Sequence, residues 1–189
     1  MKKEIITISG RPGAGKSSTA DLVAKELGYD RFSSGDFMRK MALDREISLI
    51  ELSAIAERGR SIDEEIDAEI KKLRGREGTV IDSRLAYHFI PESFKVFLDL
   101  SLEISRERVL KDLDKNKLRK MSDKSKNTDE VYAEITRRLE SEHKRYKKLY
   151  GIEDYTAKQN YDLIVDTNKN NLQEVAEIIV KKYRNWLNN

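Results

Sequence analysis

Apolar runs alternate with polar, helix-forming segments along this chain of 189 residues. Four short runs rich in Val, Ile, Leu and Phe predict strands, because a buried parallel strand reads as a nearly continuous apolar run. These runs cover residues 5–8, 79–82, 95–100 and 161–166, and the short segment 29–33 is a fifth strand candidate. Helices are predicted over residues 19–27, in several pieces over 36–75, and over 102–113, 129–150 and 172–187. We therefore expect one α/β domain over 1–189, a five-stranded parallel sheet with helices on both faces.

The segment 36–75 stands out because it is polar, helical and inserted between the second and third predicted strands. We expect it to form a small helical insert beside the sheet. Residues of the types that cap helix N-termini precede its helices. The predicted caps are Ser34, Ser48 paired with Glu51, and Ser61 paired with Glu64.

The composition and charge of the chain argue against several classes of protein. Charged residues make up 38% of the chain, yet the net charge is only +3 and bases alternate with acids, which does not favour a nucleic-acid partner. The absence of cysteine excludes disulfides and thiolate metal sites. No apolar run approaches the ~20 residues of a membrane span. The first strand starts too early to leave room for a signal peptide, so we expect a cytoplasmic enzyme without a membrane partner. The oligomeric state stays open, with a monomer favoured over an oligomer.

The stretch 10–17 fits the pattern G-x-x-x-x-G-K-[ST] of a phosphate-binding P-loop, with a predicted strand before it and a helix after it. Glycines let the backbone turn its N–H groups inward, and the helix N-terminus favours an anion. Lys16 is expected to reach the β- and γ-phosphates of ATP, and the Ser17 hydroxyl to bind Mg²⁺. The alternative is a chance match in a glycine-rich loop. The predicted ATP-binding residues are Gly10, Arg11, Pro12, Gly13, Ala14, Gly15, Lys16, Ser17 and Ser18.

Asp82 ends the third predicted strand, where P-loop proteins often keep a carboxylate near Mg²⁺. The alternative is an ordinary turn residue at the end of a strand. Ser83 and Arg84 follow it, at the edge of the sheet where open α/β sheets bind ligands.

The segment 115–127 is rich in lysine and lies within a region, 104–128, that we interpret as a mobile lid over the polyphosphate. A solvated loop without that role is the alternative. Arg106 or Arg108, at the entry to this region, could stack on adenine or could be surface residues.

Three charged residues, Arg138, Glu142 and Arg145, fall on one side of the predicted helix 129–150, and Glu142 lies within its apolar stripe. A buried carboxylate needs a partner, and the two arginines lie one turn away on either side. The group is therefore either a structural ion-pair array or a pair of cleft-facing arginines that Glu142 holds in place.

Several of these motifs together resemble those of the nucleoside monophosphate kinase family, in particular short cytidylate kinases of the archaeal type. The resemblance covers nearly the whole chain. It rests on the P-loop, on Ser33-Ser34-Gly35-Asp36-x-x-Arg39, on Asp82-Ser83-Arg84-Leu85-Ala86, on Arg138-x-x-x-Glu142-x-x-Arg145, and on the stretch 161–167. Related kinases usually have glycine where this chain has Ser83, so the acceptor base stays open.

The resemblance implies ATP and Mg²⁺ as cofactors, with Ser17 and Asp82 at the metal. It implies an acceptor-binding role for Ser34, Asp36, Arg39, Arg84, Arg138, Glu142 and Arg145, and a catalytic role for Lys16, Arg138 and Arg145. The activity expected is ATP-dependent phosphorylation of a nucleoside monophosphate, with CMP or dCMP favoured. An adenylate kinase, another small-metabolite kinase and a regulatory P-loop ATPase remain as alternatives.

Overall fold

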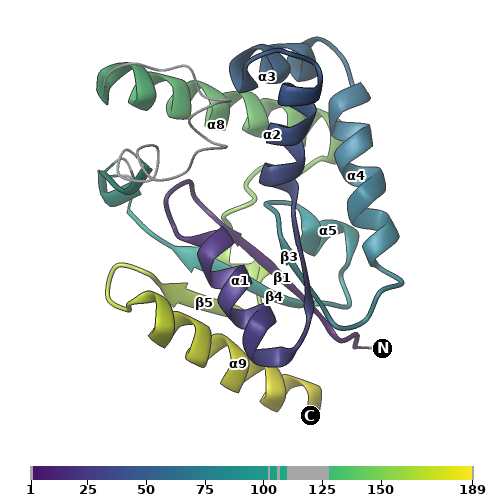
Figure 1. The fold of residues 1–189 in the computed structure, drawn as a ribbon, viewed down its shortest axis with the longest axis vertical. Coiled ribbons are helices and arrows are strands. Elements are labelled where there is room, and N and C mark those ends of the chain that lie inside the picture. Colours follow the sequence, from purple (N-terminus) through teal and green to yellow (C-terminus); the bar gives the residue numbers. More distant parts are fainter. Residues whose placement is uncertain (1, 102, 106, 110–127, 189) are drawn as a thin grey trace.

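A five-stranded parallel sheet forms the centre of the molecule (Figure 1). The computed structural model describes residues 2–101, 103–105, 107–109 and 128–188. The strands are β1 (Ile5–Gly10), β2 (Asp30–Ser33), β3 (Thr79–Asp82), β4 (Phe94–Asp99) and β5 (Leu163–Asp166), in the order β2-β3-β1-β4-β5. All four neighbouring pairs are parallel, which confirms the predicted fold class. Because the strands are parallel, their carboxyl ends meet at one edge of the sheet, where β1 and β3 deliver the P-loop and Asp82.

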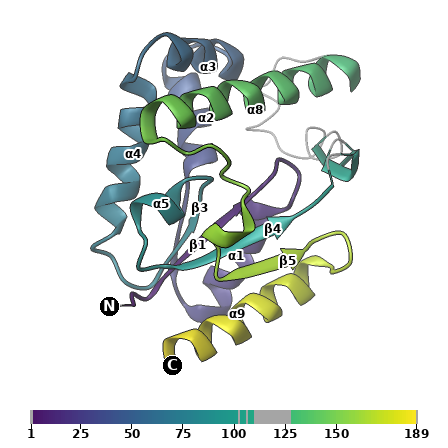
Figure 2. The same cartoon turned by 180° about the vertical axis from the view of Figure 1, so that it is seen from behind.

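Helices cover both faces of this sheet (Figures 1 and 2). They are α1 (Lys16–Leu27), α2 (Ser34–Asp44), α3 (Leu49–Arg58), α4 (Ser61–Leu73), α5 (Ala86–Phe89), α8 (Thr128–Tyr150) and α9 (Leu172–Asn188), with a 3-10 turn at Lys158–Asn160. Helices α1 and α9 pack together on one face, and α4 and α5 lie against the other. Helix α8 spans the end of the molecule beside α3, above the carboxyl edge of the sheet.

Alternation along the strands divides the main core between the two faces. Ile6 and Ile8 of β1 are fully buried in the cluster that includes α1 and α9. Ile5 of the same strand is buried in the cluster that includes α4 and α5. At roughly 25 cal/mol per Å² of apolar surface, these contacts supply the main stabilisation of the scaffold under the site.

The insert α2–α4 has a core of its own, built around Met38, Leu49, Leu52 and Ile62. This cluster explains how a polar segment can stand beside the sheet as a folded unit. The insert reaches the sheet through Ile66 of α4, which packs against this core and also against the cluster beneath α4 and α5 that includes Phe32 of β2.

One of the predicted helix caps of the insert is confirmed and two are wrong. The Ser48 side chain accepts from the Glu51 N–H, and Glu51 accepts from the Ser48 N–H, as the capping box requires. The Ser61–Glu64 box does not form, because Arg60 occupies the N-cap of α4 in a helical conformation and makes Ser61 the first helical residue.

The N-cap of α2 is Ser33, not Ser34, because the last residue of β2 already has the extended backbone that a cap needs. The Ser33 hydroxyl accepts from the Asp36 N–H at 3.2 Å. Ser34 instead lies in the first turn of α2, and its hydroxyl donates to the Asp82 carbonyl at 3.3 Å.

The predicted helix 102–113 is helical where the structure describes it, at residues 103–105 and 107–109. Most of the predicted lid, including the lysine-rich stretch 115–127, lies outside the described residues, so the lid stays a prediction. Across the described part of the chain, no helix combines the length and the apolar character needed to cross a membrane.

Candidate active site

The P-loop occupies the turn between β1 and α1 and has the backbone conformation that an anion-binding loop requires. Gly13 and Gly15 have φ angles of 72° and 82°, in the left-handed region that favours glycine. A Cβ at Gly13 would also lie 2.7 Å from the Ser105 carbonyl oxygen, so a side chain there would collide with backbone. Helix α1 starts directly after Gly15, and its first N–H groups therefore open toward the loop.

Lys16 lies folded along this loop. Its Nζ donates to the carbonyl oxygens of Gly10 at 3.0 Å and Arg11 at 3.2 Å. The ammonium group is thereby held over the concavity formed by the loop backbone, where a phosphate can be bound.

The other polar residues of the predicted ATP set have different positions. Arg11 turns toward the end of β4, where it donates to the Leu100 carbonyl at 3.0 Å and pairs with Asp99 at 3.4 Å. It therefore ties the P-loop to the neighbouring strand. Ser17 faces Asp82, whereas Ser18 lies on the exposed side of α1. Whether each of these residues touches ATP stays a prediction.

Ser17 and Asp82, the two residues predicted to hold Mg²⁺, lie close together. Ser17 Oγ donates to Asp82 Oδ2 at 2.7 Å, and Ser33 Oγ donates to the same oxygen at 3.1 Å. Asp82 is buried, and the pairing of β3 with β1 places it beside Ile8, just before the P-loop. Hydroxyl and carboxylate oxygens are the donors that Mg²⁺ prefers.

This oxygen set fits Mg²⁺ bound together with a nucleotide. Among the residues that the structure describes, no group of three or more His, Cys, Asp and Glu gathers into a self-sufficient metal site. A metal held by Ser17 and Asp82 would take its remaining ligands from phosphates and water, as Mg²⁺ usually does in kinases. Sequence reasoning missed Ser33, whose register opposite Asp82 becomes visible only in the sheet.

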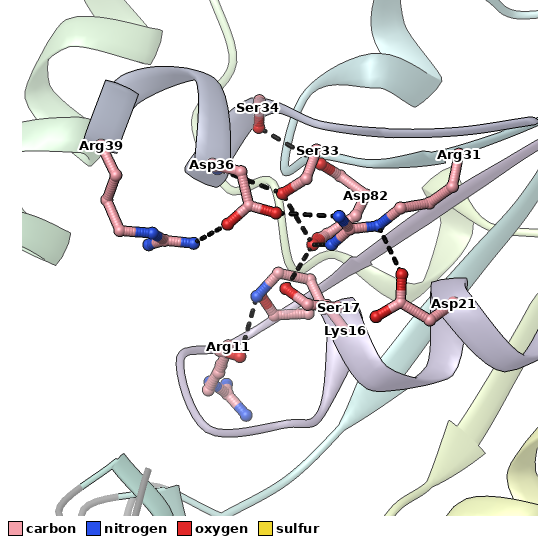
Figure 3. Close-up of polar contacts among 11 residues, drawn as sticks. Arg11, Lys16, Ser17, Asp21, Arg31, Ser33, Ser34, Asp36, Arg39 and Asp82 are labelled. Atoms are coloured by element: carbon pink, nitrogen blue, oxygen red, sulfur yellow. Dashed lines mark hydrogen bonds and ion pairs between the residues drawn. The ribbon is translucent and has the colours of Figure 1, made fainter. Parts of the chain in front are cut away.

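The predicted acceptor residues Asp36 and Arg39 form a short ion pair in the first turns of α2 (Figure 3). Arg39 Nη2 donates to Asp36 Oδ1 at 2.6 Å, and the Arg39 side chain is only 8% exposed. Burial alone would raise the pKa of Asp36, but the hydrogen bonds and charges of Arg39 and Arg31 bring it below its ordinary value. The pair therefore presents a fixed guanidinium at the carboxyl edge of the sheet.

Arg31 is a second residue that the sequence analysis missed. Its guanidinium lies between Asp36, Asp82 and Asp21 (Figure 3). It therefore connects the Ser17–Asp82 pair to the Asp36–Arg39 pair. The signal in the sequence is the spacing of two residues between Arg31 and Ser33, which places both on the same face of β2. This spacing becomes informative only once β2 is known to lie beside Asp82.

Glu142 and Arg145 are buried, but their partners differ from those expected. Glu142 Oε2 lies 3.1 Å from Arg84 Nε, so the carboxylate pairs with the residue after β3. Arg145 Nε donates to Asp63 on α4 at 2.9 Å, and Arg145 Nη1 donates to Ser141 Oγ at 2.6 Å. The expectation that Glu142 and the two arginines of α8 pair among themselves is therefore wrong for Arg145. Helix α8 therefore forms ion pairs with two different parts of the fold, with Arg84 after β3 and with Asp63 on α4.

The Arg138 side chain lies outside the described residues, so its proposed role is untested. Arg108, one of two candidates for covering adenine, donates to the Thr167 carbonyl after β5 at 2.8 Å. Arg106, the other candidate, is not among the described residues, and the adenine role of either stays a prediction.

The Arg84–Glu142 pair lies among aromatic rings. Burial alone would lower the pKa of Arg84, but Glu142 and the tyrosine oxygens raise it, so the guanidinium stays charged. Burial raises the pKa of Tyr155, and the nearby Arg84 guanidinium offsets part of the rise. A buried, permanently charged arginine with one edge on a carboxylate can offer its other edge to a phosphate.

The site combines a P-loop between a parallel strand and a helix, the Ser17–Asp82 contact and the inserted helices. This combination defines a P-loop kinase. The model of the cytidylate kinase-like family matches residues 5–169. The chain belongs to this family and is a nucleoside monophosphate kinase.

The relatives of this chain include cytidylate kinases, and solved kinase structures share its fold. A cytidylate kinase from Halobacterium salinarum is 34% identical, over 93% of this chain and 87% of the relative. An S-adenosylmethionine-dependent nucleotide dehydratase from Lacinutrix mariniflava is 30% identical, over 96% of this chain and 36% of that protein. A shikimate kinase structure from Acinetobacter baumannii superposes with a TM-score of 0.59 at 15% identity, over 96% of this chain and 93% of that one, which shows the fold alone.

Proposed function

We propose that this protein transfers the γ-phosphoryl group of ATP to the phosphate of CMP, and of dCMP, giving the diphosphate and ADP. The observation that carries the proposal is that the P-loop site and the Asp36–Arg39 pair of the insert are connected through side-chain contacts. Asp82, which contacts Ser17 of the P-loop, lies in one ion-pair network with Asp36 and Arg39 of the insert. A nucleotide site joined to a fixed arginine is what an in-line transfer between two phosphates needs.

On the nucleotide side, the P-loop backbone and Lys16 bind the β- and γ-phosphates. Lys16 is already held over the loop by two carbonyl oxygens, so little reorganisation precedes binding. Ser17 and Asp82 would hold Mg²⁺, which would neutralise the charge of the phosphates when bound. Phosphoryl transfer has a loose transition state, so these positioning and charge effects provide most of the catalysis.

On the acceptor side, Arg39 and Arg84 bind the monophosphate and align its oxygen for attack. Each is buried or half-buried and is oriented by a carboxylate, Arg39 by Asp36 and Arg84 by Glu142. A guanidinium held in this way is better suited than a lysine to two-pronged binding of phosphate. Arg145 supports this side by joining α8 to the insert.

CMP is the favoured acceptor because of the family and its relatives. The Halobacterium salinarum relative, similar over nearly the whole of both chains, is a cytidylate kinase. The acceptor base itself would be selected by residues of the insert and of α8, which close the opposite side of the site from the P-loop.

The test is a panel of acceptors. ADP formation from ATP and Mg²⁺ is measured with CMP, dCMP, UMP or AMP, and without acceptor, and the phosphorylated product is identified by chromatography. We expect CMP to give the highest kcat/KM and CDP to accumulate in step with ADP. A preference for AMP would replace the acceptor. ADP formation that no monophosphate changes would overturn the kinase proposal in favour of an ATPase.

A further inference from the structure

Arg31 contacts three carboxylates that come from three different elements. Its Nη1 donates to Asp36 Oδ2 on α2 at 2.8 Å, and its Nε lies 3.1 Å from Asp21 Oδ1 on α1. Its Nη2 lies 3.7 Å from Asp82 Oδ2 at the end of β3. The Arg31 side chain is 23% exposed and that of Asp82 is 5% exposed, so these charges interact with limited screening by water.

Asp36 transmits the position of Arg31 to Arg39. One oxygen of Asp36 accepts from Arg31 and the other accepts from Arg39. Both arms of the carboxylate are thereby occupied, and its rotation is fixed from both sides. Arg39 Nε is buried with no hydrogen-bond partner in the described part of the chain, so the contact with Asp36 is what orients its guanidinium.

The contact with Asp82 has the opposite consequence. The Asp82 oxygen that faces Arg31 is the one that accepts from Ser17 and Ser33. A cation beside this carboxylate reduces its attraction for a second cation, because like charges repel at short range. Arg31 therefore helps to orient Arg39 on the acceptor side while lowering the affinity of Asp82 for a metal ion.

We propose that Arg31 is a positioning residue of the phosphoryl-transfer site that orients Arg39 through Asp36 and limits the affinity of Asp82 for Mg²⁺. The inference rests on the proposed function for the roles of Arg39 and Asp82. It adds that one side chain sets the balance between acceptor binding and metal binding. Its removal should shift the two affinities in opposite directions, which a merely structural residue would not do.

The experiment compares Arg31→Gln and Arg31→Lys with the wild-type chain and with the control Arg45→Gln. Arg45 is also a paired arginine, 2.8 Å from Glu65, but it is exposed at the end of α2 and away from the site. Two quantities are measured for each protein. One is the KM for the monophosphate that the wild type prefers in the acceptor panel. The other is the ratio of ATP dissociation constants, by titration calorimetry, without and with saturating Mg²⁺.

Arg31→Gln should raise the acceptor KM about tenfold, because Asp36 loses one of its two guanidinium partners. It should also raise the Mg²⁺ enhancement of ATP binding about fivefold, because the repelling charge is gone. Arg31→Lys keeps the charge but not the planar fork. It should leave the Mg²⁺ enhancement near the wild-type value and still raise the acceptor KM. Arg45→Gln should change neither quantity.

Melting temperatures separate these effects from misfolding. If Arg31→Gln does not fold, Arg31→Lys decides alone, through a raised acceptor KM at unchanged Mg²⁺ enhancement. An acceptor KM within twofold of wild type in the folded variants, or an Mg²⁺ enhancement that falls in Arg31→Gln, would overturn the proposal. A wild type that accepts no monophosphate would instead refute the proposed function, and the ATP titrations would still test the influence of Arg31 on the metal.

Discussion

The nucleotide side and the acceptor side of the site are built in different ways. The P-loop is one continuous stretch, Gly10 to Ser17, whose shape depends on glycine backbone angles and on short-range contacts of Lys16. The acceptor side is assembled from residues far apart in the chain, such as Arg145 and Asp63, which are 82 positions apart. The phosphate-binding loop therefore depends mainly on local sequence, whereas the Arg84–Glu142 and Arg145–Asp63 pairs of the acceptor side depend on the whole fold being in place.

This difference predicts how the two sides respond to substitution. A side chain of the P-loop acts mainly on the ligand, so its loss should reduce turnover and leave the fold intact. A buried charge of the acceptor side also holds helices together, so its loss should reduce stability as well.

The largest effect is expected for Lys16→Ala. Removing a charge that binds the transferring phosphoryl group should lower kcat/KM about a hundred- to several-thousand-fold, or roughly 3–5 kcal/mol. The melting temperature should change little. Steady-state kinetics and thermal melting measure both, with Lys25→Ala in the last turn of α1 as the matched control. Wild-type turnover by a folded Lys16→Ala variant would contradict the assignment of the loop.

Arg145→Met should behave differently, because it leaves the buried Asp63 carboxylate without its partner. Breaking a buried pair from one side costs about 3 kcal/mol or more. Burial already raises the pKa of Asp63, and removing Arg145 takes away the charge that offsets this rise. Thermal and urea unfolding would measure the loss.

The double variant Asp63→Asn with Arg145→Met is the control for this pair. Because neither charge is then buried alone, it should recover most of the lost stability. If Arg145→Met melts like the wild type but has lost turnover, Arg145 acts on substrate and the division between the two sides does not hold at this residue.

Glu142→Gln is expected to have an intermediate effect. The amide keeps the shape of the side chain but not the charge that orients Arg84. The acceptor KM should rise about tenfold, equivalent to about 1.4 kcal/mol, with the ATP affinity unchanged. Glu140→Gln, at an exposed position two residues earlier on α8, is the matched control. An equal loss of ATP affinity would show that Glu142 does not act on the acceptor side alone.

The smallest effect separates two caps that look alike in the sequence. Ser48→Ala should cost about 1 kcal/mol, or a few degrees in melting temperature, because Ser48 caps α3. Ser61→Ala should stay within about 0.5 kcal/mol, because Ser61 lies inside α4 and caps nothing. Differential melting of the two variants decides, and equal losses would contradict the assigned helix start.

The same contrast explains what could be predicted from the sequence. Strands β1, β3, β4 and β5, the P-loop and the Ser17–Asp82 pair follow from apolar runs, glycine spacing and the end of a strand, all of which are local signals. Arg31 and Ser33 were missed because their roles arise where β2 lies beside β3 in the sheet. The partner of Arg145 was predicted wrongly because helical spacing finds neighbours one turn away, whereas burial brought in Asp63 from α4. Helical spacing also could not reveal Arg84, which pairs with Glu142 from the segment after β3.

The most direct test of the two-sided site is the pair of ligand affinities of Arg39→Met. Arg39 carries the buried guanidinium proposed to bind the acceptor phosphate, and Met replaces its stem without its charge. Titration calorimetry of CMP, and separately of ATP with Mg²⁺, gives both dissociation constants. CMP binding should weaken at least ~30-fold, the loss of a charge-assisted contact of about 2 kcal/mol, while ATP binding should stay within twofold of wild type. Unchanged CMP binding, or an equal loss for both ligands, would contradict the two-sided site.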